Sequence, residues 1–127
     1  KFKKKKKLVL WGTGKVKREF LHSKDLASAS LFIMELSKKK YTKLKSSDFS
    51  HVNVGYGKDV TIKELARKIK KIVNFKGNIE FDNKKYMDGT PRKILSSSKI
   101  FKLGWRPKIS LEEGLSTTYK YFLNKND

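Results

Sequence analysis

A carboxylate, a turn and two cations lie within six consecutive residues, 88–93, which read DGTPRK. A carboxylate accepts hydrogen bonds from hydroxyl groups, and cations pair with phosphate oxygens, so this segment suits a polyhydroxyl or phosphate ligand. A solvent-exposed turn is the alternative, because Asp, Gly and Pro favour a turn without any ligand. The residues alone leave both interpretations open.

A second chemically rich segment is WGTGKVKREFLH, residues 11–22. Its two glycines do not make a dinucleotide-binding GxGxxG turn, because the third glycine would fall at Lys17. The second glycine pair of the chain, Gly55 and Gly57, fails in the same way, with Val60 in the third place. The segment also lacks the upstream glycine and the Ser or Thr of a P-loop. It is therefore not a standard nucleotide cradle.

Metal and thiol chemistry find no support in the sequence. His22 and His51 have no third ligand at metal spacing, and a histidine in a strand is more often a structural residue. The chain has no cysteine, which excludes a disulfide framework, a thiolate metal site and a cysteine nucleophile. We therefore predict no metal site in this chain.

The formal net charge is +20 over 127 residues, about the length of one domain. Such a charge can bind nucleic acid through counterion release. However, only four of the 32 basic residues are arginines, and the lysines are spread over nearly every polar segment. A lysine-biased composition explains this pattern without a partner. We therefore disfavour a basic nucleic-acid-binding module, while keeping it as an alternative.

Apolar runs are short throughout the chain. None approaches the roughly 20 residues of a membrane span. The basic start is followed only by the apolar residues 8–10, too few for the core of a signal peptide. We expect a soluble, cytoplasmic protein without a membrane partner.

The first third of the chain predicts two extended stretches and a helix. The stretches are residues 8–11, which run into a glycine turn, and residues 18–22. Ser23 can cap a helix that extends to about Leu36, with apolar residues at helical spacing. The lysine- and serine-rich residues 37–50 predict a surface loop.

The remainder predicts an alternation of strands and helices. Strands are expected at 51–54 and 78–81. Between them, Thr61 and Glu64 form a capping box that begins a helix, with Gly77 as its end. The apolar stripe of this helix is expected to be buried; it comprises Ile62, Leu65, Ala66, Ile69, Ile72 and Val73.

The last third predicts a polar loop and two helices. The loop covers residues 82–93, and a short helix at 99–103 ends at Gly104, with Trp105 packed behind it. Ser110 and Glu113 form a second capping box for the last helix. The apolar face of that helix comprises Leu111, Leu115, Tyr119, Phe122 and Leu123.

The order of these segments resembles the C-terminal half of GDP-L-fucose synthases, which are epimerase/reductases of the extended short-chain dehydrogenase/reductase family. The resemblance rests on WGTGKVKREFLH, HVNVGYGKDVTIKELA, FDNKKYMDGTPRK and LGWRPKISLEEGL, and it covers nearly the whole chain from Leu8 onward. The last motif and the NVG strand are shared by many nucleotide-sugar epimerases and dehydratases. The loop that begins at Trp11 and the DGTPRK segment are more specific to GDP-L-fucose synthases.

The resemblance implies an α/β chain that is the C-terminal portion of a Rossmann-type NAD(P)-binding fold. Residues 1–127 would be its substrate-binding portion and would include segments that complete the Rossmann domain. The glycine-rich turn for NADPH, the Tyr-x-x-x-Lys pair and the epimerising cysteine and histidine would lie in an N-terminal half absent here. The complete enzyme would convert GDP-4-keto-6-deoxy-D-mannose to GDP-L-fucose with NADPH, as a homodimer. This chain would bind the GDP-sugar and be inactive alone.

Four substrate-binding residues are carried over from the family's motifs. Trp11 and Arg18 would line the nucleotide-sugar cleft, and Asp88 and Lys93 would close it from another loop. A guanidinium and an ammonium can pair with the charges of a diphosphate, while an indole offers flat apolar area to a ring. Another nucleotide-sugar epimerase or dehydratase of the same family remains an alternative.

The chain departs from the family's usual pattern at three positions. Lys24 stands where an acidic residue is usual, Met87 where a proline is usual, and Ser96 where an aspartate is usual. These changes concern local loop geometry and leave the cationic positions in place.

Overall fold

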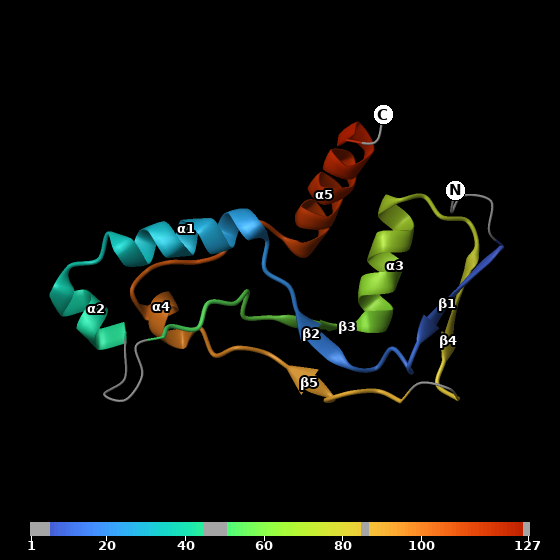
Figure 1. Ribbon diagram of the computed structural model, residues 1–127, viewed down its shortest axis with the longest axis horizontal. Coiled ribbons are helices and arrows are strands. Elements are labelled where there is room, and N and C mark those ends of the chain that lie inside the picture. The colour runs from blue at the N-terminus through green and yellow to red at the C-terminus, as the bar shows by residue number, and fades with distance from the viewer. Residues whose placement is uncertain (1–5, 45–50, 85–86, 126–127) are drawn as a thin grey trace. The chain divides into compact units, whose positions relative to one another are not determined.

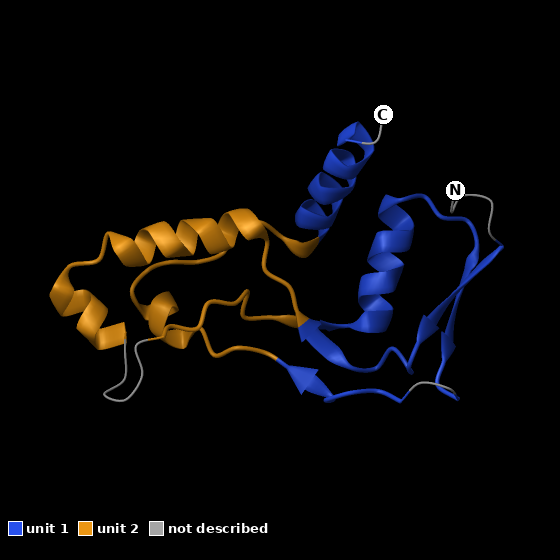
Figure 2. Cartoon of the chain, in the orientation of Figure 1, with its two compact units in different colours: residues 1–18, 60–93, 112–127 blue, residues 19–59, 94–111 orange. Residues whose placement is uncertain are grey.

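Figure 1 shows the helices and strands of the chain, and Figure 2 shows the two units that they form. The computed structural model describes residues 6–44, 51–84 and 87–125. Unit 1 draws on residues 1–18, 60–93 and 112–127, and unit 2 on residues 19–59 and 94–111. Both helices and strands are present, which confirms the α/β class.

Two parallel strands form the first sheet of unit 1. Strand β1 (Lys7–Trp11) pairs with β4 (Asn78–Asp82), with Leu8 opposite Ile79 and Leu10 opposite Phe81. Parallel strands need a crossover connection, and helix α3 (Ile62–Ile72) lies between them in the chain. Both strands were predicted within one residue of their ends.

The predicted capping box begins α3. The Glu64 N–H donates to Thr61 Oγ1 at 3.1 Å, and the Thr61 N–H donates to Glu64 Oε2 at 2.8 Å. These bonds hold the pKa of Glu64 below its usual value, since both the backbone and the hydroxyl of Thr61 stabilise the carboxylate. The helix ends earlier than predicted, because Asn74 adopts a left-handed φ of 53° three residues before Gly77.

The apolar stripe of α3 is less covered than expected. No residue of the helix is buried among those described, and Ile69 is 39 % exposed. The stripe instead forms one wall of an apolar groove of about 840 Å³ within unit 1. Its other walls come from β1, β4, α5 (Leu111–Lys125) and the connection between α3 and β4, which supplies Phe75. They include Leu8, Leu10, Ile79, Tyr119, Phe122 and Leu123.

A second sheet has three short strands in the order β3-β2-β5. Its strands are β2 (Lys17–Glu19), β3 (Asp59–Thr61) and β5 (Arg92–Lys93). The extended stretch predicted at 18–22 is thus a three-residue strand, and the predicted 82–93 loop contains β5 at its end. Helix α5 is tied to α3 by an ion pair between Lys68 and Glu112, which lowers the pKa of the Glu112 carboxyl.

The hydrophobic core of unit 2 is built on Ala29, Leu44, Ile100 and Trp105. Helix α1 (Ser23–Met34) supplies Ala29, and α4 (Ser98–Lys102) supplies Ile100. The cap of α1 is His22 rather than the predicted Ser23, because His22 Nδ1 accepts a hydrogen bond from the Lys24 N–H at 3.1 Å.

Two further predictions in unit 2 are wrong. Part of the expected 37–50 loop is helix α2 (Lys38–Leu44), whose last residue is only 1 % exposed in the core; residues 45–50 lie outside the described part. Residues 51–54 do not form a strand in the described structure. Val52 and Val54 pack against the core cluster instead of joining a hydrogen-bonded ladder.

The LGWRP segment has a structural role in unit 2. As predicted, Trp105 packs behind α4, with its ring stacked on Phe101 at a centroid distance of 6.1 Å. Its indole N–H donates to Ser28 Oγ at 3.0 Å. The Arg106 guanidinium lies 4.5 Å from the centre of the Phe101 ring and donates to the carbonyls of Phe101 and Trp105.

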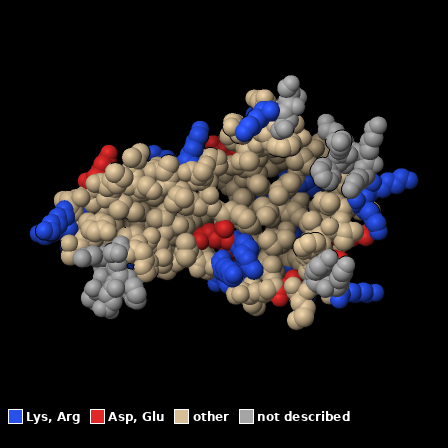
Figure 3. Space-filling model, viewed as in Figure 1, with Lys and Arg blue, Asp and Glu red and all other residues tan. Residues whose placement is uncertain are grey.

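Basic side chains are scattered over both units on the face that Figure 3 shows. They do not gather into a single patch there, which agrees with a compositional origin of the charge. No helix in the described residues combines the length and hydropathy that crossing a bilayer requires.

Candidate functional site

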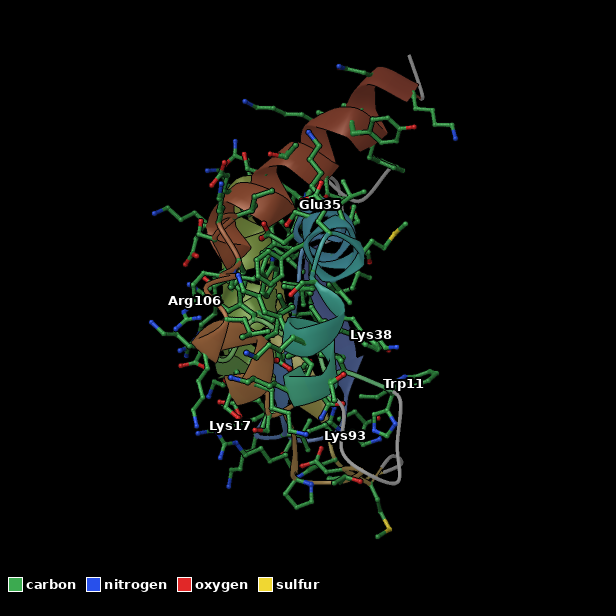
Figure 4. All side chains as sticks on the ribbon, turned by 90° about the vertical axis from the view of Figure 1, so that its left-hand side faces the viewer. Trp11, Lys17, Glu35, Lys38, Lys93 and Arg106 are labelled. Atoms are coloured by element: carbon green, nitrogen blue, oxygen red, sulfur yellow. The ribbon has the colours of Figure 1, made fainter. Side chains whose placement is uncertain are left out.

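Strands β2 and β5 bring two of the predicted site residues together. They pair in parallel, with Lys17 opposite Arg92 and Arg18 opposite Lys93. Successive residues of a strand point to opposite faces, so Arg18 and Lys93 share one face of this sheet. In Figure 4, Lys93 and Trp11 lie toward one side of the ribbon and Lys17 toward the other. Two cations 75 positions apart in sequence thus become neighbours.

The Arg18 side chain is oriented by backbone carbonyls. Its Nη1 donates to the carbonyl oxygen of Thr90 at 2.9 Å and to that of Lys17 at 2.6 Å. Its Nη2 lies 4.0 Å from where a side chain at Gly89 would begin, so the guanidinium lies along the DGTPRK segment. Because Arg18 is half-buried and held at one nitrogen, its planar group is fixed before any ligand binds.

Asp88 lies beside the first glycine turn. Its Oδ1 accepts a hydrogen bond from the Thr13 N–H at 2.9 Å, and its Oδ2 is bonded to the Thr13 hydroxyl. The bond from the Thr13 hydroxyl, followed by the bond from its N–H, holds the pKa of Asp88 below its usual value. The positive charges of Lys15 and Arg18 lower this pKa as well. The carboxylate is therefore an oriented anion at the surface.

Trp11 ends strand β1 and is 70 % exposed. The next residue, Gly12, donates its N–H to the Asp82 carbonyl at 2.9 Å and so extends the β1–β4 pairing by one bond. An indole this exposed offers a flat apolar surface to a ligand ring. All four predicted residues belong to unit 1.

Both glycine pairs are occupied by protein contacts and do not fit a dinucleotide. A Cβ on Gly14 would lie 2.5 Å from the Phe81 ring, and a Cβ on Gly55 would lie 2.5 Å from the Glu19 carboxylate. These glycines allow close packing rather than an open cradle for a pyrophosphate. The described residues likewise contain no group of three potential metal ligands.

Two residues with long-range hydrogen bonds, Thr13 and Glu19, were not singled out from the sequence. Thr13 is the partner of Asp88, and its position between two glycines in WGTG was the available signal. Glu19 accepts hydrogen bonds from the N–H groups of Gly57 at 2.6 Å and Leu95 at 3.1 Å within unit 2. No sequence pattern links Glu19 to those two distant segments.

The chain is similar in sequence and fold to known enzymes. The model of the NAD dependent epimerase/dehydratase family matches residues 1–55. The chain is 52 % identical over 116 residues to a putative GDP-L-fucose synthase 2 of Arabidopsis thaliana, covering 91 % of this chain and 32 % of the relative. It is 48 % identical over 120 residues to GDP-L-fucose synthase of Escherichia coli, covering 94 % and 37 %.

A solved GDP-mannoheptose C4 reductase of Campylobacter jejuni, with NADP bound, has the same fold. Its TM-score is 0.80 at 39 % identity, covering 93 % of this chain and 35 % of that one. In sequence and fold, the chain is similar to one portion of these enzymes. It spans about a third of the length of the curated relatives it matches. The recognition made from its motifs is confirmed.

Proposed function

We propose that this chain is the GDP-sugar-binding portion of an NADPH-dependent epimerase/reductase that makes GDP-L-fucose from GDP-4-keto-6-deoxy-D-mannose. The observation that carries the proposal is the register of Arg18 against Lys93 beside the DGTPRK segment. Two cations on one face, with a carboxylate and an exposed indole in the same unit, match the parts of a nucleotide-sugar.

Each of the four residues has a distinct task in this proposal. The Arg18 fork and the Lys93 ammonium pair with the diphosphate, and the guanidinium supplies two parallel hydrogen bonds. Trp11 packs its indole against a ring of the ligand. Asp88 accepts hydrogen bonds from sugar hydroxyls, which an ionised carboxylate does well. Together they bind and orient the substrate without forming or breaking a bond.

The reduction step is assigned to a different portion of the fold. Since the glycine pairs of this chain do not fit a dinucleotide, we assign NADPH binding and hydride transfer to sequence that this chain does not match in its relatives. We further propose that unit 2, residues 19–59 and 94–111, completes that Rossmann domain. The complete protein would act as a homodimer in the cytoplasm.

Calorimetric titration tests the binding half of the proposal. GDP-mannose, a stable substrate analogue, and GDP should bind the full chain, whereas mannose alone should not, because most contacts are to the nucleotide diphosphate. A single-stranded oligonucleotide at the same salt concentration should not compete. Absent GDP-mannose binding, or displacement by the oligonucleotide at equal concentration, would overturn the proposal in favour of a basic nucleic-acid-binding module.

Complementation tests the catalytic half. The chain is mixed or co-expressed with a polypeptide comprising the portion of the Escherichia coli relative that it does not match. NADPH oxidation with GDP-4-keto-6-deoxy-D-mannose is expected only when both polypeptides are present. Activity of this chain alone would contradict the assignment of hydride transfer elsewhere.

A related GDP-sugar reductase is the second candidate. The similarity to a GDP-mannoheptose C4 reductase at 39 % identity favours this candidate, because a GDP-mannoheptose has the same GDP moiety as the proposed substrate but a different sugar. A panel of GDP-4-keto-sugars, offered to the complemented enzyme, separates the two candidates by kcat/KM. Preference for a heptose over the 6-deoxyhexose would select the alternative.

A further inference from the structure

The contact between Thr13 and Asp88 joins two loops of unit 1 that are 75 residues apart in sequence. Thr13 donates two hydrogen bonds, from its backbone N–H and from its hydroxyl, to the two carboxylate oxygens of Asp88. The same hydroxyl accepts a hydrogen bond from the Lys15 N–H at 3.1 Å. The hydroxyl proton is thereby directed to Asp88, because the Lys15 amide occupies a lone pair of the oxygen.

The glycines on either side of Thr13 make this approach possible. Gly12 and Gly14 have φ angles of +80° and +72°, a conformation that residues with a Cβ rarely adopt. A Cβ on Gly12 would also collide with Asp88 Oδ1. The G-T-G turn therefore brings its middle residue against the Asp88 carboxylate and leaves no room for a larger residue at Gly12.

The same turn and the same segment carry the proposed ligand contacts. Trp11 stands two residues before Thr13, at the end of β1. On the other segment, Thr90 stands two residues after Asp88 and accepts the hydrogen bond from Arg18. Residues 88–90 are thus tied at both ends, once by Thr13 and once by Arg18.

We propose that Thr13 is a positioning residue of the GDP-sugar site, orienting the Asp88 carboxylate toward a pair of ligand hydroxyls. This inference rests on the proposed function. A carboxylate offers about four lone-pair positions, of which Thr13 takes two, so two remain for a vicinal diol. Thr13 does not touch the ligand in this arrangement and acts through Asp88.

Conservative substitutions of Thr13 test the role. Thr13→Val keeps the shape and the backbone N–H but removes the hydroxyl, so the dissociation constant of GDP-mannose should rise by about threefold to tenfold. Thr13→Ser restores the hydroxyl and should return the constant to within about twofold of the parent. Thr117→Val is the matched control, because its hydroxyl donates to the Glu113 carbonyl at 2.8 Å, within α5.

The pH profile separates positioning from mere loop stabilisation. In the parent, the hydrogen bonds from Thr13 lower the pKa of Asp88 and keep its carboxylate ionised. GDP-mannose affinity should therefore be constant between pH 8 and pH 5 and fall only below pH 3.8, the ordinary pKa of an aspartate. In Thr13→Val the fall should begin at higher pH, because the carboxylate loses a stabilising donor. A role confined to loop stability would not shift the onset.

The outcomes distinguish this inference from the proposed function. If Arg18→Ala binds GDP-mannose like the parent, the proposed function fails. If Arg18→Ala weakens binding but Thr13→Val matches the parent in affinity and pH onset, only the role of Thr13 is wrong. If circular dichroism shows that Thr13→Val does not fold, Asp88→Asn is the deciding variant. Its GDP-mannose affinity should no longer fall at low pH. An affinity that still falls would overturn the inference.

Discussion

The Arg18 guanidinium donates to the Thr90 carbonyl at 2.9 Å, and this bond joins β2 to the segment that leads into β5. It orients a cation next to Lys93, its register partner on the neighbouring strand. A hydrogen bond to a neutral carbonyl does not neutralise the guanidinium, which also interacts electrostatically with the Asp88 carboxylate. This relationship makes Arg18 the most informative residue to change.

Arg18→Ala should weaken GDP-mannose binding by roughly tenfold to a hundredfold, since a charge-assisted contact contributes on the order of 1.5 to 3 kcal/mol. Arg18→Lys should also weaken binding, because an ammonium cannot supply two parallel hydrogen bonds. Calorimetric titration measures both variants. The matched control is Arg67→Ala, on the exposed side of α3, which should bind like the parent.

The complemented enzyme adds a second readout for Arg18. Its NADPH affinity should not change in Arg18→Ala, because the cofactor is assigned to a different portion of the fold. Equal losses of GDP-mannose and NADPH affinity would instead identify Arg18 as a folding residue.

Lys93→Ala should act in the same direction as Arg18→Ala but more mildly, by about twofold to fivefold. Lys93 is exposed at the end of a two-residue strand, and a flexible exposed ammonium contributes little in water. Titration at low and physiological salt checks this, with a larger effect expected at low salt. A loss as large as that of Arg18→Ala would show that the ammonium is desolvated in the complex.

The N-terminal lysines should be dispensable for binding. Changing Lys3–Lys7 to glutamine should leave GDP-mannose affinity within about twofold, because exposed charges are screened over a Debye length of roughly 8 Å at physiological salt. Lys3–Lys5 lie outside the described residues, and Lys7 pairs with Glu80 at 3.1 Å, with both side chains mostly exposed. A tenfold loss would contradict the compositional interpretation of the charge.

Features that depend on local hydrogen bonds were predictable from the sequence. The Thr61 capping box, the short helix before Gly104 and the packing of Trp105 each involve residues a few positions apart, so spacing alone indicates them. The cap at His22 was missed by one residue, because a histidine nitrogen replaces the serine oxygen that the pattern favoured.

Features that depend on distant segments were not predictable in this way. Helix α2 forms where composition indicated a loop, since its helix-favouring lysines are anchored by Leu44 in a core that the local sequence does not reveal. Residues 51–54 alternate like a strand, but Val52 and Val54 pack against that core instead. Thr13 and Asp88 are 75 residues apart in sequence. The family motifs indicated Asp88 as a site residue but gave no indication that Thr13 is its hydrogen-bond partner.

The capping box predicts a pH-dependent stability of α3. The folded-state pKa of Glu64 is lowered, so its contribution is fully present above the unfolded value of 4.5 and is lost as pH falls through the folded value. Helix content followed by circular dichroism from pH 7 to pH 3 should fall earlier in the parent than in Glu64→Gln, which has no carboxylate to protonate there. Identical profiles would contradict this role.

The apolar groove of unit 1 predicts that the chain exposes hydrophobic surface. Tyr121 and Phe122 at the end of α5 are 67 % and 59 % exposed, and on α1 of unit 2 Leu26 and Met34 are 49 % and 80 % exposed. Patches of this kind bind the dye ANS and favour association. The full chain should therefore enhance ANS fluorescence and unfold with low cooperativity.

A substitution within the groove makes this prediction specific. Ile69→Ser removes apolar area from its α3 wall and should lower ANS fluorescence, whereas Lys63→Ser, on the exposed side of the same helix, should not. Adding the complementing polypeptide should suppress the dye signal if it covers these surfaces in the assembled enzyme. A sharp cooperative melt of a monomer, without ANS binding, would show that the groove and the exposed helix faces are closed in solution.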